Sequence, residues 1–371
     1  MAAEIKSPQS LRGRSTLGRW RSPSTALLLE SAERRDDEVG VCVLSPPTDL
    51  DPDAVVRVLT HWGLREVRLL YLPVGFGSHH WSACRGGGRR FFVTVDDLEA
   101  GFQAGEDADA AFAALDRAYR TAAALRDDAG LEFVLAPLYD GEGAIIRRLD
   151  ERHAVSVAPF VDGTSSPYGE YESNDKRERM GGLLGRLHAA GEGIPAGLPR
   201  RDDGSIPSRT TLEEALATLD LPWDTGPFAE PARALLADHA DELDLQLRTY
   251  DALVPRVRER SDSWVITHGE PHRRNVMVDT RGGLRLVDWD TTLVAPRERD
   301  LRMVLDERLT GWDEYISVVG DVPLDHEALE LYRQWWDIAD IAVFIALFRR
   351  PHEENENTVA SFEVLRSNLN G

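Results

Sequence analysis

The stretch from Trp264 to Asp290 constrains this chain more than any other, because it alternates short apolar runs with glycines and acids. Apolar residues occupy positions 264–266 and 276–278 and, apart from Arg285, positions 284–287, and polar or glycine-containing segments separate these runs. Short apolar runs bounded by Gly and Asp are typical of strands joined by turns. The stretch therefore predicts a strand, a polar loop and a hairpin that ends in an acid.

Three oxygen-bearing side chains fall in the polar loop and at the end of the hairpin: Glu270, Asn275 and Asp288. Short strands would hold them around one point. Phosphoryl transfer from a nucleotide needs such a set, because one carboxylate accepts or orients the proton of the attacking hydroxyl while an amide oxygen and a second carboxylate hold magnesium. The spacing is that of the kinase catalytic loop and its metal-binding aspartate.

The segments HGEPHRRNVM and LVDWD resemble the catalytic loop and the metal loop of the aminoglycoside phosphotransferase and choline kinase family, in particular its spectinomycin-phosphotransferase-like branch. The resemblance implies an α+β, two-lobed protein-kinase-like fold, with a small antiparallel β-sheet N-lobe and a larger, mainly helical C-lobe. It also implies ATP or GTP as co-substrate, with Mg²⁺. Glu270, where the family usually has Asp, is then the base beside His268, and Asn275 and Asp288 are the metal ligands.

Two other interpretations of this loop carry less weight. His268 and His272 stand four apart, as zinc ligands on a helix do. Gly269 and Pro271 interrupt any helix there, so a zinc site is disfavoured. The acids taken singly are also typical of turns, but their joint spacing favours phosphoryl transfer.

A loop with two glycines precedes a predicted strand much earlier in the chain. Gly75 and Gly77 would let backbone amides approach phosphate oxygens closely, because neither position carries a side chain, and Ser78 adds a hydroxyl. The strand at 91–95 is where the resembled family carries the lysine that holds the nucleotide phosphates, and Thr94 stands in that place. We therefore predict nucleotide contacts at these glycines, at Ser78 and at Thr94.

The missing lysine leaves several alternatives open. The helix expected at 107–126 has only Asp116 as an acid on its inner turns, so the usual glutamate partner is missing as well. Phosphate contact passes to the loop histidines or to arginines, or the nucleotide binds weakly. The candidate residues are His79, His80, Arg90, Arg147 and Arg148.

The last strands of the small sheet are expected at 132–136 and 143–146. The run Phe160-Val161 then resembles the segment between the family's lobes, whose backbone N–H and C=O groups pair with the nucleotide base. A plain linker is the alternative, and the sequence does not separate the two.

These features divide the chain into three parts. Residues 1–47, rich in Ser, Arg and Pro, are expected to form a disordered extension, or to result from a start codon placed too early. Residues 48–160 are expected to form the nucleotide-binding N-lobe. Residues 161–371 are expected to form the catalytic and acceptor-binding C-lobe.

Apolar residues at helical spacing predict helices in the C-lobe. The expected ranges are 211–219, 228–239, 241–260 and 326–348. The last of these carries Trp336, Asp337 and Asp340, and an aromatic ring beside carboxylates can stack on and pair with a sugar or an amine. Aromatics at helical spacing are also typical of a core, so both interpretations stay open.

Composition limits the partners. The net charge of -21 argues against nucleic acid, whose phosphates require a basic face, and it fits either a cationic acceptor or mere solubility. No apolar run is long enough for a membrane span, and the only cysteines, Cys42 and Cys84, fit a reducing cytoplasm. We therefore expect a cytoplasmic protein without nucleic-acid or membrane partners, and the oligomeric state is left open.

The sequence thus predicts an enzyme that moves the terminal phosphate of ATP or GTP to a hydroxyl of a small molecule, with an aminoglycoside or other antibiotic as the favoured acceptor. Two alternatives remain. One is a kinase of a primary metabolite such as choline or a sugar. The other is a catalytically impaired, kinase-like regulator that binds a nucleotide or metabolite, which the missing lysine favours and the set of Glu270, Asn275 and Asp288 opposes.

Overall fold

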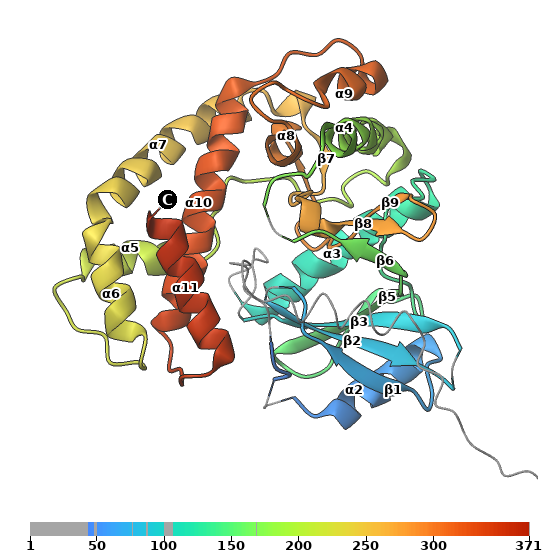
Figure 1. Cartoon of the computed structure of the whole chain (residues 1–371), viewed down its shortest axis with the longest axis horizontal. Coiled ribbons are helices and arrows are strands. Elements are labelled where there is room, and N and C mark those ends of the chain that lie inside the picture. Colours follow the sequence, from blue (N-terminus) through green and yellow to red (C-terminus); the bar gives the residue numbers. More distant parts are fainter. Residues whose placement is uncertain are drawn as a thin grey trace, which may run out of the picture. The chain divides into compact units, whose positions relative to one another are not determined.

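The computed structural model describes residues 44–47, 50–75, 77–86, 88–99, 107–167 and 169–370 (Figure 1). The extension predicted at 1–47 lies outside these ranges, apart from residues 44–47. Among the helices of the described residues, none is both long enough and apolar enough to cross a membrane.

An antiparallel sheet of five strands forms within residues 68–159 (Figure 1). In spatial order its strands are β1 (Arg68–Leu72), β2 (Ser78–Cys84), β3 (Arg90–Asp97), β5 (His153–Pro159) and β4 (Ile146–Arg148). Before the sheet come α2 (Pro52–Leu59) and the 3-10 turn η1 (Thr60–Trp62), and α3 (Ala108–Asp127) follows β3. The Asp51 carboxylate caps α2 by accepting a hydrogen bond from the Asp53 amide at 2.9 Å.

The two faces of this sheet differ in polarity, because successive residues of a strand point to opposite faces. Trp81, Val93 and Val157 pack with Val55 and Leu59 of α2 in one buried cluster. The opposite face carries Ser78, His80, Thr94, Asp96 and Ser156. The face that includes Thr94 is therefore polar and points away from α2.

The two strands predicted at 132–136 and 143–146 are wrong in their placement. The first segment lies outside the five-stranded sheet and makes a single parallel bridge, between Val134 and Leu286. The Leu286 amide donates to the Phe133 carbonyl at 2.8 Å, so this apolar segment is buried against the hairpin of the predicted catalytic region. The last strand of the small sheet, β4, starts only at Ile146.

The stretch from Trp264 to Asp290 contributes strands to two further antiparallel sheets. β6 (Gly163–Ser165), β8 (Val276–Asp279) and β9 (Leu284–Leu286) form one, with β8 in the centre. β7 (Val265–Thr267) pairs with β10 (Leu293–Ala295) in the other. The predicted strand, loop and hairpin are confirmed.

The rest of the described chain is mainly helical. The helices predicted at 211–219, 228–239, 241–260 and 326–348 are confirmed within two residues at each end. Their bounds are α5 (Arg209–Ala217), α6 (Ala229–Asp238), α7 (Ala240–Arg258) and α10 (His326–Phe348). The remaining elements are α4 (Asn174–Ala189), η2 (Ala190–Gly193), η3 (Ser261–Ser263), η4 (Arg273–Asn275), α8 (Glu298–Val304), α9 (Trp312–Val319) and α11 (Glu356–Asn370).

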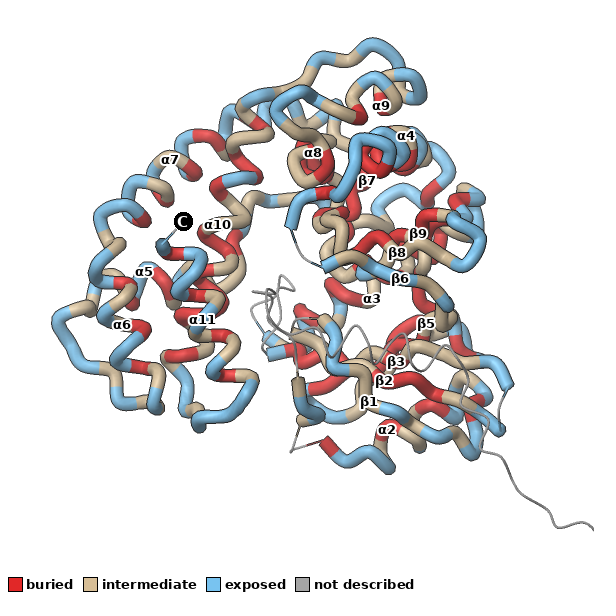
Figure 2. Tube along the Cα trace, in the orientation of Figure 1, coloured by how far each residue is buried: buried red, intermediate tan, exposed pale blue. Residues whose placement is uncertain are grey.

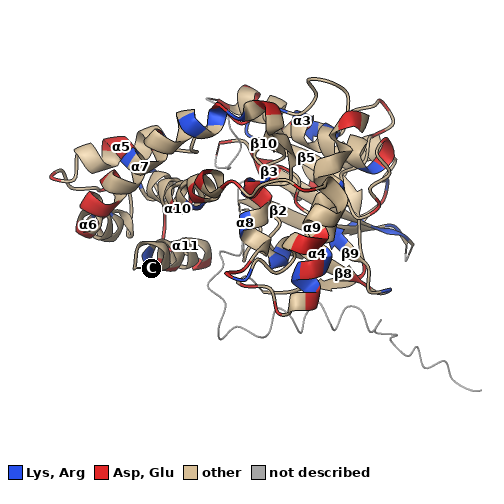
Figure 3. Cartoon of the chain, turned by 90° about the horizontal axis from the view of Figure 1, so that it is seen from above, with Lys and Arg blue, Asp and Glu red and all other residues tan. Residues whose placement is uncertain are grey.

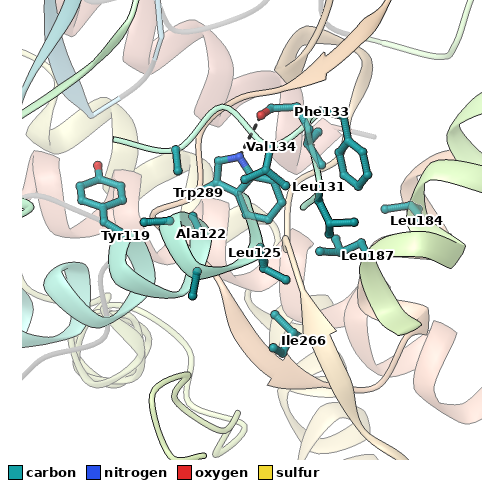
Figure 4. Packing of buried hydrophobic residues seen from close by; sticks show 14 of the residues in the cluster. Tyr119, Ala122, Leu125, Leu131, Phe133, Val134, Leu184, Leu187, Ile266 and Trp289 are labelled. Carbon is teal, nitrogen blue, oxygen red and sulfur yellow. Dashed lines mark hydrogen bonds between the residues drawn. The ribbon is translucent and has the colours of Figure 1, made fainter. Parts of the chain in front are cut away.

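Trp289 is buried in the core that supports the hairpin (Figure 4). Its indole N–H donates to the Leu286 carbonyl at 2.8 Å, and Leu125 of α3, Leu187 of α4 and Ile266 of β7 belong to the same cluster. Because Trp289 lies between Asp288 and Asp290 in the chain, its burial fixes the backbone that carries these two acids.

A second core joins helices α5, α6, α7, α10 and α11. Figure 2 shows its buried residues along α10, and Ile338, Ala342 and Ile345 are among them. Since α10 is the common member of these contacts, this core sets the direction of the helix that carries Trp336, Asp337 and Asp340.

Helices α4 and α9 make a close approach at Gly181. A Cβ atom at position 181 would overlap the carbonyl oxygen of Gly311, whereas a Cβ at Gly182 would be 3.8 Å from the Glu314 Cβ, an ordinary contact. A methyl group would therefore clash at Gly181 but fit at Gly182.

We predict opposite effects for Gly181→Ala and Gly182→Ala on stability. Gly181→Ala should lower the free energy of unfolding by about 1–3 kcal/mol, since the added methyl forces the helices apart. Gly182→Ala should raise it by about 0.5–1 kcal/mol, since alanine is the better helix former. Urea unfolding of both variants measures this difference, and equal midpoints would rule out the close contact.

Candidate functional site

The loop that follows β7 is anchored by a buried carboxylate. Asp300 of α8 accepts hydrogen bonds from the backbone amides of His268 at 2.9 Å and Gly269 at 2.7 Å. It also accepts one from His188 Nε2 of α4 at 3.1 Å, and the other nitrogen of that ring lies 2.9 Å from the Tyr315 hydroxyl of α9. Asp300 is fully buried, and it ties the loop to three helices.

Gly269 is required in this loop for two physical reasons. Its φ of +105° lies in the region that favours glycine, and a Cβ atom there would overlap the guanidinium of Arg299. Arg299 is held in turn, since it donates to the Thr267 hydroxyl at 3.0 Å and to the Thr291 carbonyl at 2.9 Å. The His-Gly pair of the motif therefore reflects close packing as well as chemistry.

His268 uses both ring nitrogens to hold the backbone. Nδ1 accepts from the Glu270 amide at 3.1 Å, and Nε2 donates to the Val287 carbonyl at 2.8 Å. Burial lowers its pKa to about 4, so the ring is neutral at physiological pH. His268, predicted as a catalytic residue, thus has both ring nitrogens hydrogen-bonded to the backbone of the site.

Hydrogen bonds link the three residues singled out in the sequence. The Asn275 amide nitrogen Nδ2 donates to the Glu270 carbonyl at 3.1 Å. The Val287 amide donates to the Asn275 carbonyl at 3.0 Å, and Asp288 follows directly. The structure therefore brings Glu270, Asn275 and Asp288 together.

Asp288 has an unusual backbone and an unusual electrostatic environment. Its φ of +67° is rare for a residue with a side chain, and such strained positions concentrate at functional sites. Desolvation by the surrounding protein and repulsion from Asp290, Glu270 and Asp96 raise its pKa well above the ordinary value. A hydrogen bond between Asp288 and Asp290 acts in the same direction.

These four acids, Asp96, Glu270, Asp288 and Asp290, form what we term the carboxylate cluster. Burial, followed by repulsion from Asp290, raises the pKa of Glu270 to about 8. Burial also raises the pKa of Asp96 to about 7, against a hydrogen bond from Ser78 and with a contribution from Asp290. Buried carboxylates that raise one another's pKa favour either shared protons or a bound cation.

Sequence reasoning missed two members of the carboxylate cluster. Asp290 follows Asp288 by two positions in the run LVDWD, which was a visible signal. Asp96 follows Thr94 by two positions, so it lies on the same face of β3. The sequence does not show that Asp96 lies near Asp290, because only the fold places β3 beside the hairpin.

The glycine loop between β1 and β2 has the predicted backbone freedom. Gly75 and Gly77 have φ values of +88° and +76°, and Phe76 between them lies outside the described residues. The Ser78 hydroxyl, predicted to contact the nucleotide, donates to Asp96 Oδ1 at 2.7 Å. Ser78 is thus bound to the carboxylate cluster in this structure.

Thr94 lies at the position where the family's lysine was expected. The contacts around it differ from those of a lysine–glutamate pair. Thr94 Oγ1 is 3.2 Å from His80 Nδ1 on the neighbouring strand. Asp116 of α3 pairs with Arg120 on its own helix at 2.7 Å. The Tyr119 hydroxyl on the same helix instead donates to Asp96 Oδ2 at 3.4 Å.

The segment after β5 is held against β3. The Phe160 amide donates to the Arg90 carbonyl at 3.4 Å, and the Arg90 guanidinium lies 4.0 Å from the Phe160 ring centroid. Arg90 also pairs with Asp162. These contacts fix Phe160 and Val161 at the end of the sheet, where the nucleotide base was predicted to bind.

On α10, Asp340 approaches the predicted base. Its charge contributes to the raised pKa of Glu270, and burial raises its own pKa to about 7. Trp336 lies one turn away, 5.4 Å beneath the guanidinium of Arg302 from α8. Asp337 pairs with Arg333 at 3.5 Å and lines a cavity of about 520 Å³ between α7, α10 and α11.

Residues 83–335 match the family model of the phosphotransferase enzyme family, and the chain belongs to that family. Protein StrN of Streptomyces griseus is 27% identical over 253 residues, which cover 65% of this chain and 73% of that protein. The resemblance predicted from the loop motifs is confirmed.

Solved structures with a similar fold support the predicted architecture. Spectinomycin phosphotransferase in complex with ADP and spectinomycin has a TM-score of 0.66 at 16% identity, covering 86% of this chain and 95% of that one. Amicoumacin kinase in complex with AMP-PNP and Ca²⁺ has a TM-score of 0.50 at 13% identity, covering 86% and 93%. The predicted α+β, two-lobed protein-kinase-like fold is confirmed.

We predict that Asp300→Ala destabilises the protein by about 3–5 kcal/mol, because the loop amides and His188 lose a buried charged acceptor. Burial alone raises the pKa of Asp300, but the hydrogen bond and charge of His188 outweigh it and lower the pKa. The contribution is therefore full above the unfolded-state pKa of about 3.9 and is lost as the pH falls through the lower folded value.

Urea unfolding at neutral and acid pH measures this effect, with the exposed Asp262→Ala as control. The difference between wild type and Asp300→Ala should stay constant around neutral pH and shrink only in strong acid. A loss no larger than that of the control would show that the loop does not depend on this carboxylate.

Proposed function

We propose that this protein transfers the terminal phosphate of ATP or GTP to a hydroxyl group of a small molecule. The observation that carries this proposal is the convergence of Glu270, Asn275 and Asp288 at one place, linked by hydrogen bonds through the loop anchored on Asp300. Membership of the phosphotransferase enzyme family supports the same class of reaction.

Glu270 is the proposed proton acceptor for the attacking hydroxyl. Its side chain is 17% exposed, so it is reachable yet largely desolvated. Burial, followed by the charge of Asp290, raises the pKa of Glu270, which makes this carboxylate a stronger proton acceptor than one in water. His268 is the proposed positioning residue, since both its nitrogens hold the loop backbone.

The donor set at this site fits magnesium. Asp288, Asp290 and the Asn275 amide supply only oxygen ligands, which Mg²⁺ prefers. A bound Mg²⁺ would supply positive charge that offsets the negative charge of the phosphates. The mutual repulsion of the carboxylate cluster supports this assignment, because a divalent cation would relieve it.

We propose that the nucleotide and the acceptor bind to different regions of the chain. Residues 48–160, with the loop at Gly75 and Gly77 and the segment Phe160-Val161, would bind the nucleotide. Residues 161–371 would carry the catalytic and acceptor-binding groups. The ADP in the spectinomycin phosphotransferase structure supports a nucleotide as the phosphate donor.

The acceptor is proposed to bind between the catalytic loop and α10. Asp340 beside Glu270, together with Asp337, favours an acceptor with an amine, such as an aminoglycoside or related antibiotic, and Trp336 offers an apolar surface. In Figure 3, acidic residues (red) and basic residues (blue) both occur throughout the described part of the chain, so the preference rests on these local acids. Choline or a sugar is the alternative acceptor.

A nucleotide-binding regulator is the second candidate, and a specific observation favours it. Thr94 occupies the lysine position, and Asp96 bonds to Tyr119 where a lysine–glutamate pair was expected. A screen of hydroxylated antibiotics and metabolites with ATP and GTP, read as nucleoside diphosphate release, separates the two. Nucleotide binding without release above the rate in the Glu270→Gln variant would establish the regulator.

We predict that Glu270→Gln lowers turnover on the order of a hundredfold or more while nucleotide affinity is kept, because the amide has the same size but accepts no proton. Steady-state kinetics and calorimetry measure the two quantities. The exposed Glu259→Gln is the control. Rates within a few-fold of wild type would remove Glu270 from the mechanism.

We predict that Asp288→Asn weakens magnesium-dependent nucleotide binding at least about tenfold, because a charged oxygen ligand is lost. Calorimetric titration with nucleotide, with magnesium and with EDTA, checks this prediction. The variant should show little difference between the two conditions, and the exposed Asp321→Asn should behave as wild type. Unchanged affinity in magnesium would contradict the metal assignment.

A further inference from the structure

The arginines that sequence reasoning offered as substitutes for the missing lysine are all held by other groups. Arg90 pairs with Asp162 and covers the Phe160 ring. Arg147 pairs with Asp140 at 2.6 Å, and Arg148 pairs with Asp109 and donates to the Ala108 carbonyl. A nucleotide triphosphate needs cationic or N–H donors near the glycine loop, so other residues must supply them.

His80 occupies the space next to the lysine position. It lies directly opposite Thr94 across the β2–β3 pair, with Nδ1 at 3.2 Å from the threonine hydroxyl, and its ring centroid is 4.9 Å from that of Phe92. Its other nitrogen, Nε2, faces the glycine loop, since a Cβ atom at Gly75 would be only 2.7 Å from it. A lysine at position 94 would need the volume that this imidazole fills.

The neighbouring histidine is arranged differently. His79 lies on the opposite face of β2, where its Nδ1 is 3.3 Å from the Tyr71 hydroxyl and its ring is 6.2 Å from that of Trp81. Sequence reasoning treated the two histidines alike. The alternation of the strand separates them, so only His80 shares a face with Thr94 and Asp96.

His80 is uncharged at physiological pH. Burial, followed by the charges of His79 and Arg274, lowers its pKa to about 3. At the glycine loop it therefore acts as a neutral hydrogen-bonding ring.

We propose that His80 binds the nucleotide phosphates in place of the strand lysine of the family, an inference that rests on the proposed use of a nucleotide. Nδ1 of His80 faces the Thr94 hydroxyl and Nε2 faces the glycine loop. In the tautomer that carries its proton on Nε2, the ring accepts from Thr94 and offers an N–H donor to a phosphate at the loop.

Direct binding tests this inference independently of catalysis. His80→Ala should weaken ATP binding about tenfold and leave adenosine binding unchanged, because only the phosphates meet this donor. His79→Ala is the matched control, since that ring lies on the opposite face of the same strand. Calorimetry with ATP and with adenosine measures both variants.

A gain-of-function variant guards against simple loss of structure. In the His80→Ala background, Thr94→Lys should restore ATP affinity to within a few-fold of wild type, since the lysine then has room to reach the phosphates. Failure of this rescue, ATP affinity unchanged by His80→Ala, or equal losses of ATP and adenosine would each overturn the inference. A wild-type protein that binds neither ATP nor GTP would overturn the proposed function as well, which distinguishes the two failures.

Discussion

The site depends on the hydrogen bonds that the buried Asp300 carboxylate accepts. A charge with no access to water is tolerated only when several donors surround it, and here two loop amides and His188 do so. Because these donors come from the loop and from α4, while Asp300 itself belongs to α8, one charge fixes the relation between three segments. The positions of His268, Gly269 and Glu270 follow from it, and the close fit of Arg299 beneath Gly269 removes the remaining freedom.

The carboxylate cluster works against stability, and the surrounding core holds it in place. Asp288 and Asp290 repel each other and Glu270, yet Trp289 between them is buried and hydrogen-bonded to Leu286. The apolar contacts of the Trp289 ring hold Asp288 and Asp290 close together although their charges repel each other. Repulsion of this kind is what a cation would relieve, so the same arrangement that strains the free protein would favour metal and nucleotide.

The small sheet shows how a fold can keep its architecture while its charges are rearranged. A lysine was expected on β3 and a glutamate on α3. In their place, Thr94 contacts His80, and the Tyr119 hydroxyl donates to Asp96. The compensating donor, as we propose, is His80 on the next strand. Such an exchange needs only that the new groups reach the same point in space, because phosphate oxygens accept hydrogen bonds from any suitably placed donor.

Local patterns in the sequence determined the catalytic loop, the hairpin and the long helices, since loop spacing and helical periodicity depend on residues that are near one another in the chain. The segment at 132–136 shows the limit, because its apolar pattern did not reveal that it would pack against Leu286 instead of joining the small sheet. Only the tertiary structure placed Asp96 beside Asp290, separated His80 from His79, and paired the candidate arginines with acids elsewhere. Those outcomes depend on contacts between residues far apart in sequence, and no local pattern encodes them.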